Sequence, residues 1–134
     1  MELTSCYPVL LSRDVAAARD CLTRWFGFEV VFDSGWYASL RHRSAPSQEI
    51  AVVAHDHPTV PAAYRRTARG VVVNLEVTDV DAQWQRMVVE GGLEPALELR
   101  SEDFGQRHFI VAGPEGLLVD VITPIPPAGE FADA

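Results

Sequence analysis

The apolar and polar positions in the first half of the chain predict one strand, one helix and three further strands. Residues 7–12 form a short apolar run, and Asp14 follows in the position of a helix N-cap, where its carboxylate accepts from free backbone amides. Apolar residues then recur at helical spacing from Val15 to Phe26, and Gly27 can end the helix. Three runs of strand length follow, at residues 28–32, 36–40 and 50–54.

The second half of the chain repeats this order at a constant offset of 65 residues. Asp14 falls on Asp79 and Gly27 falls on Gly92, with a strand-like run before each Asp and a helix-like run after it. One βα unit is therefore used twice. The second set of elements is expected as a strand at 71–77, a helix from 80 to 90, and strands at 95–99, 108–112 and 117–123.

This pattern predicts an α+β fold of two βαβββ modules that form a curved mixed sheet around a cleft. One helix can cover only one face of each four-stranded sheet, so the other faces must meet or curl around a common cavity, where a ligand would bind. Within a single domain of residues 1–134, we expect a first module at 5–54, a polar connector at 55–69, a second module at 70–123, and a tail at 124–134 that frays.

Composition and charge narrow the possible partners of this 134-residue chain. Its formal net charge of −8 argues against nucleic acid and anionic membranes, and is compatible with a cationic small ligand. No apolar run approaches the roughly 20 residues of a membrane span, and the first residues do not read as a signal peptide, so we expect a cytoplasmic protein. Cys6 and Cys21 show no disulfide or metal spacing and are expected as small buried groups.

Four segments of the chain carry a resemblance to a known family. They are the strand–Asp–helix opening at 7–14, Arg-Trp-Phe-Gly-Phe at 24–28, Leu-Glu-Val-Thr-Asp-Val-Asp at 75–81, and the run at 105–120 that contains Gly-Pro-Glu-Gly. In this order and spacing they resemble the glyoxalase/bleomycin resistance/extradiol dioxygenase (vicinal oxygen chelate) superfamily over roughly residues 5–123. The resemblance implies the paired βαβββ fold and, in the family's enzymes, a divalent metal held by two ligands from each half.

The residues at the metal-binding positions of that family are the wrong types in this chain. The resemblance places the ligands at Tyr7 and Val72 on the first strands and at Ala51 and Asp120 on the last strands. Valine and alanine cannot bind a metal, neutral tyrosine is a poor ligand, and one carboxylate does not hold a metal. We therefore expect no metal site of the family's type and no other cofactor.

Four histidines, His42, His55, His57 and His108, are the remaining candidates for a metal or a polar site. His55 and His57 would lie on one side of an extended connector, a geometry found in metal sites, although polar side chains in a connector are usually only solvated. His108 opens a strand, and we expect it as a hydrogen-bonded pocket or core histidine rather than a metal ligand. Glu102, a few residues earlier, is expected in a solvent-facing acidic loop.

Without a metal, the cleft would be an apolar groove rich in aromatic residues. Flat aromatic ligands gain from offset stacking, and a cation gains over the face of Trp36 or Tyr7. Tyr37 and Phe109 also lie on segments expected to line the groove, and the Tyr7 phenol is expected to donate to Asp120. The predicted ligand-binding residues are Tyr7, Trp36, Asn74, Glu76, Phe104, Gln106, His108 and Asp120.

Two functions of different classes remain open, and a third possibility is a protein whose pocket is vestigial. The resemblance favours a non-catalytic binding protein, similar to members of the family that hold an antibiotic stoichiometrically in a homodimer, and here the ligand would be an aromatic or cationic antibiotic or metabolite. The alternative is an enzyme of the same superfamily, a lyase, isomerase or dioxygenase, with unorthodox metal ligands or with Asp120 or Glu76 as a general base.

Overall fold

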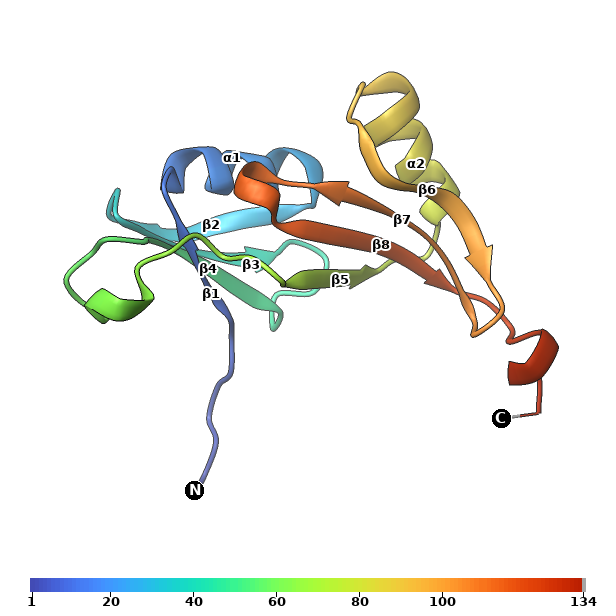
Figure 1. Ribbon diagram of the computed structural model, residues 1–134, viewed down its shortest axis with the longest axis horizontal. Helices are drawn as coiled ribbons and strands as arrows, with labels where there is room; N and C mark the ends of the chain where they lie inside the picture. Colours follow the sequence, from blue (N-terminus) through green and yellow to red (C-terminus); the bar gives the residue numbers. More distant parts are fainter. Residues whose placement is uncertain (134) are drawn as a thin grey trace. The chain divides into compact units, whose positions relative to one another are not determined.

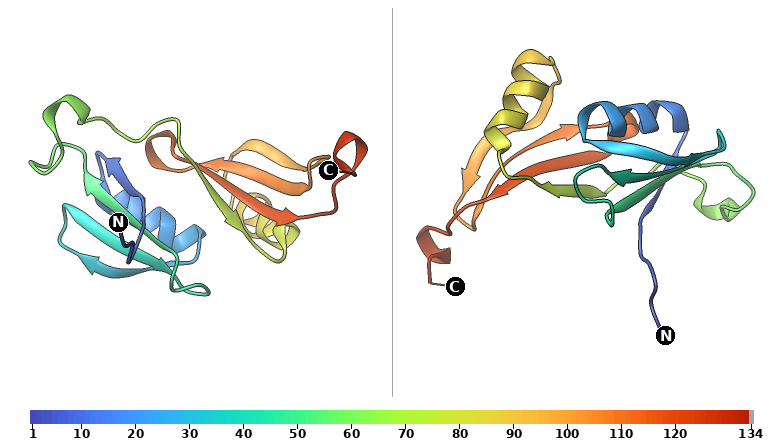
Figure 2. Two further views of the ribbon diagram at one scale, coloured as in Figure 1. Left: turned by 90° about the horizontal axis from the view of Figure 1, so that it is seen from below. Right: turned by 180° about the vertical axis from the view of Figure 1, so that it is seen from behind.

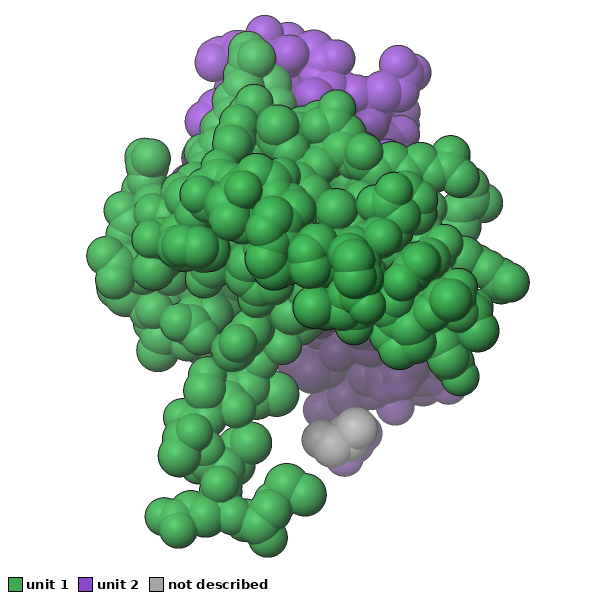
Figure 3. All heavy atoms as spheres, turned by 90° about the vertical axis from the view of Figure 1, so that its left-hand side faces the viewer, with its two compact units in different colours: residues 1–69 green, residues 70–134 purple. Residues whose placement is uncertain are grey.

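The computed structural model describes residues 1–133, and the chain divides into two compact units, Met1–Arg69 and Gly70–Ala134 (Figure 3). Each unit holds one four-stranded mixed sheet and a helix on one of its faces, and the two sheets are not closed (Figures 1 and 2). This confirms the predicted α+β fold with one βαβββ set in each half of the chain. No helix within the described residues is long and apolar enough to cross a membrane.

Unit 1, residues 1–69, is a sheet of four strands in the order β1-β4-β3-β2, with β1 and β4 parallel. The Asp14 carboxylate accepts a hydrogen bond from the Ala17 backbone amide at 2.9 Å, as expected of an N-cap. Leu22 and Phe26 are buried against the sheet. Its elements are β1 (Val9–Ser12), α1 (Val15–Trp25), β2 (Phe28–Asp33), β3 (Tyr37–His42), β4 (Glu49–Ala54) and a short 3₁₀ turn, η1 (Ala62–Tyr64).

Unit 2 has the same arrangement, with the strand order β5-β8-β7-β6 and β5 parallel to β8. Asp79 caps its helix by accepting from the Ala82 amide at 3.0 Å, and the edge of the Trp84 ring packs against the fully buried Phe109. Its elements are β5 (Val72–Glu76), α2 (Val80–Trp84), the π-helical turn η2 (Gln85–Glu90), β6 (Pro95–Glu102), β7 (Gln106–Ala112), η3 (Pro114–Gly116), β8 (Leu118–Pro124) and η4 (Gly129–Phe131).

The register of the parallel strand pairs confirms the internal repeat. Val9 is paired with Ala51 in unit 1, and Asn74 is paired with Asp120 in unit 2. The offset of 65 residues places Val9 on Asn74, so Ala51 and Asp120 occupy equivalent positions on the last strands. This equivalence is the one that the family resemblance implied.

The tail after Pro124 differs from the prediction, because it packs on unit 2 instead of fraying. The Ile125 amide donates to the Gly105 carbonyl at 3.0 Å, and the Ala128 amide donates to the Asp103 carbonyl at 2.8 Å. The Phe131 ring meets the edge of Phe104 at 6.2 Å between centroids. The β6–β7 turn therefore anchors the tail. The prolines and glycines of the tail gave no sign of this contact, because it depends on residues of the β6–β7 turn.

Smaller differences concern the ends of elements and one cysteine. The first strand begins at Val9 rather than at residue 7, and the second helix continues from Trp84 as the π-helical turn η2. Cys6 is exposed because it lies ahead of β1, in the segment that leads to the N-terminus (Figure 1), while Cys21 is half-buried on α1.

Candidate functional site

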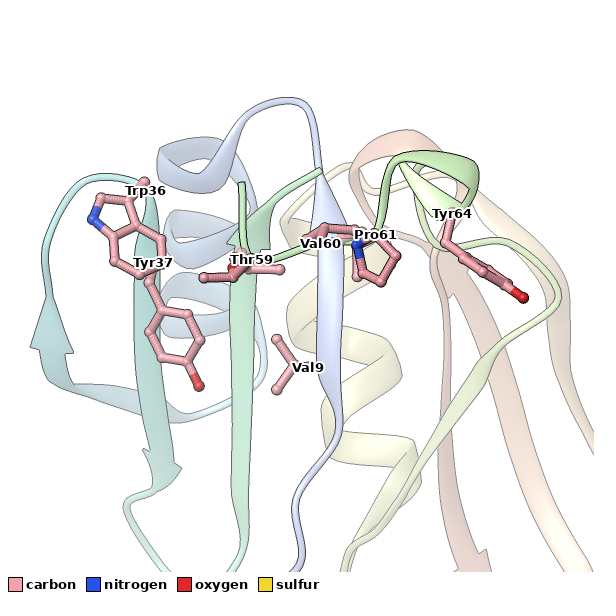
Figure 4. Close-up of a pocket in the computed structure, with 9 residues that line it drawn as sticks. Val9, Trp36, Tyr37, Thr59, Val60, Pro61 and Tyr64 are labelled. Atoms are coloured by element: carbon pink, nitrogen blue, oxygen red, sulfur yellow. The ribbon is translucent and has the colours of Figure 1, made fainter. Parts of the chain in front are cut away.

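The face of the unit 1 sheet opposite α1 carries an apolar pocket of about 520 Å³ (Figure 4). Alternation along the strands explains its sheet side, since side chains two residues apart point to the same face. The connector supplies the remaining wall, so strands and connector enclose the space together. The lining residues are Val9 and Leu11 of β1, Trp36 and Tyr37 at the start of β3, Val53 of β4, and Thr59, Val60, Pro61 and Tyr64 of the connector.

Trp36 is held in place by a stacked histidine. The rings of Trp36 and His57 are parallel within 9° and their centroids are 3.7 Å apart. His57 is fixed in turn, because the backbone amide of Thr59 donates to its Nδ1 at 3.2 Å and the Thr59 hydroxyl lies 2.8 Å from the same nitrogen. His57 covers one face of the indole and is not part of the pocket lining, which leaves Trp36 42% exposed for contact with a ligand.

Tyr37 contributes a neutral phenol to the pocket. Burial raises the pKa of Tyr37, and the neighbouring Tyr7, which hydrogen-bonds to it, and Glu49 raise this pKa further. Tyr37 therefore stays protonated at neutral pH and can donate or accept a hydrogen bond. Tyr7 is 46% exposed and is connected to the pocket through this hydrogen bond.

The connector closes the pocket with a short, internally bonded segment. The Val60 amide donates to the His57 carbonyl at 2.8 Å, and the Tyr64 amide donates to the Pro61 carbonyl at 2.9 Å. Nε of Arg65 donates to the Val60 carbonyl at 2.9 Å. These bonds position Val60, Pro61 and Tyr64 against the sheet, although the sequence predicted only a polar connector here.

A cluster of ionisable side chains lies in unit 2, where Asp120, His108 and Glu102 form one hydrogen-bonded row. Nδ1 of His108 lies 2.8 and 3.1 Å from the two carboxylate oxygens of Asp120, and Nε2 lies 2.9 Å from Oε2 of Glu102. Arg100 also donates to Glu102 at 3.0 Å. Both ring nitrogens of His108 therefore lie within hydrogen-bond distance of a carboxylate. Hydrogen bonds from His108 and then Arg100 lower the pKa of Glu102.

The predicted ligand-binding residues are thus divided between the units. Tyr7 and Trp36 belong to unit 1, and the other six belong to unit 2. Asn74 and Glu76 are exposed on β5, and Asn74 is the register partner of Asp120. Gln106 is half-buried and begins β7. Phe104 is half-exposed, and its ring centroid lies 6.5 Å from that of His108. Their role in binding stays a prediction.

Some expectations for this region are confirmed and others are wrong. His108 is a buried, hydrogen-bonded histidine, as expected. Phe109 does not line a groove, because it packs beneath Trp84 with no exposed surface. The Asp120 carboxylate has a partner within its own unit, His108, which the sequence did not indicate.

The positions that hold a metal in the resembled family do not fit one here. Ala51 is fully buried and Val72 is half-exposed, and neither has a donor atom. Asp120 is engaged by His108. Nothing between residues 1 and 133 brings three or more His, Cys, Asp or Glu side chains together as a metal site. In the connector, Nδ1 of His57 is engaged by Thr59 rather than turned towards His55.

The sequence analysis missed Val60, Pro61 and Tyr64 of the pocket lining, and its expectation of Glu102 in a solvent-facing acidic loop is wrong, because Glu102 lies beside His108. The short run Val60-Pro61-Ala62-Ala63-Tyr64 is the signal that could have revealed the first three, since it is an apolar stretch inside an otherwise polar connector. Glu102 gave no such signal, because only the β6–β7 hairpin brings it beside His108.

Comparison with known proteins identifies relatives of the fold. The model of the Glyoxalase/Bleomycin resistance protein/Dioxygenase superfamily matches residues 7–121. TioX from Micromonospora sp. ML1 is 24% identical, with a TM-score of 0.67 over 90% of this chain and 95% of its own. A glyoxalase/bleomycin resistance protein/dioxygenase from Nocardioides is 18% identical, with a TM-score of 0.74 over 97% of this chain and 89% of its own.

A lactoylglutathione lyase from Agrobacterium tumefaciens is also 18% identical, with a TM-score of 0.68 over 92% of this chain and 96% of its own. At these identities the likeness to solved structures shows the fold alone. A search among curated proteins gives no significant match.

Proposed function

Because the chain belongs to the Glyoxalase/Bleomycin resistance protein/Dioxygenase superfamily, we propose that it is a small-molecule binding protein of that family, which holds an aromatic ligand without a metal. The observation that carries this proposal is the apolar pocket of about 520 Å³ in unit 1. Pockets of roughly 300–1,000 Å³ with apolar walls and a few polar groups are typical ligand sites.

The walls of this pocket suit a flat ring system. Trp36, Tyr37 and Tyr64 supply aromatic surface to the pocket wall, and aliphatic side chains form the rest of its apolar lining. Offset stacking adds roughly 0.5–1.5 kcal/mol per aromatic pair beyond the burial of apolar area. The Trp36–His57 stack supports the proposal further, because an indole already fixed in position loses less freedom when a ligand binds.

The expected metal-free mode of binding has its own support. Alanine and valine occupy two of the four metal-binding positions implied by the family, and the Asp120 carboxylate is engaged by His108. Sequestration of an antibiotic or metabolite, a homodimeric state and a cytoplasmic location are further parts of the proposal.

A thermal-shift screen of aromatic antibiotics and metabolites tests the proposal, followed by calorimetry after dialysis against EDTA. We expect at least one compound to bind with one site per chain and without added metal. Trp36→Ala should weaken that binding at least tenfold. Trp25→Phe is the matched control, since Trp25 lies on α1 and outside the pocket lining. Binding that depends on added Zn²⁺, Fe²⁺, Mn²⁺ or Ni²⁺ would contradict the proposal.

A second candidate function, an enzyme that uses acid–base chemistry, is favoured by the row of Glu102, His108 and Asp120. Buried ionisable groups with specific charge partners, such as His108 with Glu102 and Asp120, are enriched at catalytic sites, and they also occur in structural ion pairs. The two functions differ in what Asp120→Asn does. An enzyme should lose turnover of a bound compound, whereas a binding protein should release every bound compound unchanged, which mass spectrometry of the eluted ligand measures.

A further inference from the structure

The negative charge of the chain belongs almost entirely to unit 2. Residues 1–69 contain eight arginines and seven acidic side chains, whereas residues 70–134 contain three arginines and twelve acidic side chains. The formal net charge is therefore +1 for unit 1 and −9 for unit 2. The overall charge of −8, which suggested a cationic ligand, does not describe the unit that carries the pocket.

The guanidinium of Arg65 is a positive charge held next to the pocket. Nε of Arg65 donates to the carbonyl of Val60, a lining residue, and Arg65 directly follows Tyr64, another lining residue. The hydrogen bond holds the exposed arginine at the connector wall of the pocket. A guanidinium has five N–H donors, so the single bond from Nε leaves its outer nitrogens able to pair with a carboxylate.

No acidic side chain offsets this charge inside the pocket. The residues of the chain described as its lining are aliphatic, aromatic or hydroxyl-bearing, and none is charged. Glu49 acts electrostatically on the phenol of Tyr37 from outside the lining, and Asp56 lies in the connector with its side chain largely in solvent. A cation buried in this pocket would therefore lack a carboxylate partner, which is costly.

We infer that the ligand of this pocket is a planar aromatic acid, whose ring lies against Trp36 and whose carboxylate or other acidic oxygen pairs with Arg65. This inference rests on the proposed binding function and names the ligand class. The apolar walls take the ring, and the arginine supplies the charge-assisted hydrogen bonds that select an acid over a neutral or basic ring.

Three probes with the same ring system test the inference by calorimetry on the whole protein. They are 2-naphthoate, the uncharged 2-naphthamide and the cationic 2-naphthylmethylammonium. We expect the acid to bind about tenfold more tightly than the amide, and the ammonium to bind most weakly. The preference for the acid should shrink as NaCl is raised from 0.05 to 0.5 M, because Arg65 is exposed to solvent.

Variants separate this inference from the proposed function. Arg65→Gln should bring the affinity for 2-naphthoate down to that for 2-naphthamide and leave the amide unchanged. Arg24→Gln removes the same charge from α1, on the opposite face of the sheet, and should leave the order of the three probes intact. Trp36→Ala should weaken the acid and the amide alike.

The outcomes that overturn the inference are distinct from those that overturn the binding function. Equal binding of acid and amide, tighter binding of the ammonium, or an acid preference that survives Arg65→Gln overturns the aromatic-acid inference. If binding of these probes still requires Trp36, the proposed function stands. If none of the three binds, the inference fails, and the screen described above decides the proposed function independently.

Discussion

Replacing Asp120 by alanine should destabilise the protein by about 2–3 kcal/mol. The substitution removes both oxygen contacts of Nδ1 of His108, at 2.8 and 3.1 Å, and both side chains are buried. A hydrogen bond to a charged group contributes about 1.5–3 kcal/mol, and removing one member of a buried ion pair costs about 3–5 kcal/mol. Glu102 still forms a hydrogen bond with Nε2 of His108 in the variant, so we expect a cost below that of removing one member of an isolated buried ion pair.

Urea unfolding followed by circular dichroism measures this cost through a double-mutant cycle. His108→Leu alone should cost a similar amount, and the double variant should be more stable than the sum of the two losses predicts, by at least about 1 kcal/mol. Asn74→Ala is the control, since Asn74 is the exposed register partner of Asp120 and should change stability by less than about 0.5 kcal/mol. Additive losses, or a loss in Asp120→Ala no larger than in the control, would refute the role of the row.

Three further predictions concern the caps, the pH dependence and the assembly. Asp14→Ala and Asp79→Ala should each cost about 1 kcal/mol in urea unfolding, because each removes the equivalent helix cap; a large cost at only one of them would contradict the repeat. The lowered pKa of Glu102 stabilises the fold at pH values above the ordinary glutamate pKa of about 4.3, and this stabilisation is lost as the pH falls through the lowered value. The stability difference between the wild type and Glu102→Gln, measured from pH 7 to pH 3, should therefore shrink below about pH 4.3, and a constant difference would argue against it. Sedimentation at micromolar concentration should give a homodimer, and a monomer there would contradict this part of the proposal.

Local patterns were sufficient to predict the fold. Asp14 and Asp79 marked both helix starts, and the apolar runs marked all eight strands, because caps and alternation depend on neighbours in the sequence. The family resemblance implied the equivalence of Ala51 and Asp120, which the register of the parallel strand pairs confirms. Where the observed ends of strands differ from the predicted ends, they differ by one to three residues, because the end of a strand depends on its pairing partner.

Contacts between distant residues could not be predicted in the same way. The pairing of His108 with Asp120 and Glu102 arises from the registers of β6, β7 and β8, and no spacing in the sequence contains it. The stack of Trp36 on His57 likewise depends on how the connector folds over the sheet. The candidate site was therefore predicted in part: Trp36 was identified, while the connector wall beside it was not.

The most direct test of metal-free binding in the unit 1 pocket is calorimetric titration of the EDTA-dialysed protein with its best aromatic ligand, carried out in parallel on the wild type and Trp36→Ala. We expect one ligand bound per chain of the wild type, no change in affinity on adding a divalent metal, and a loss of affinity of at least tenfold in Trp36→Ala. Affinity that appears only with metal, or that is the same in both proteins, would contradict this expectation.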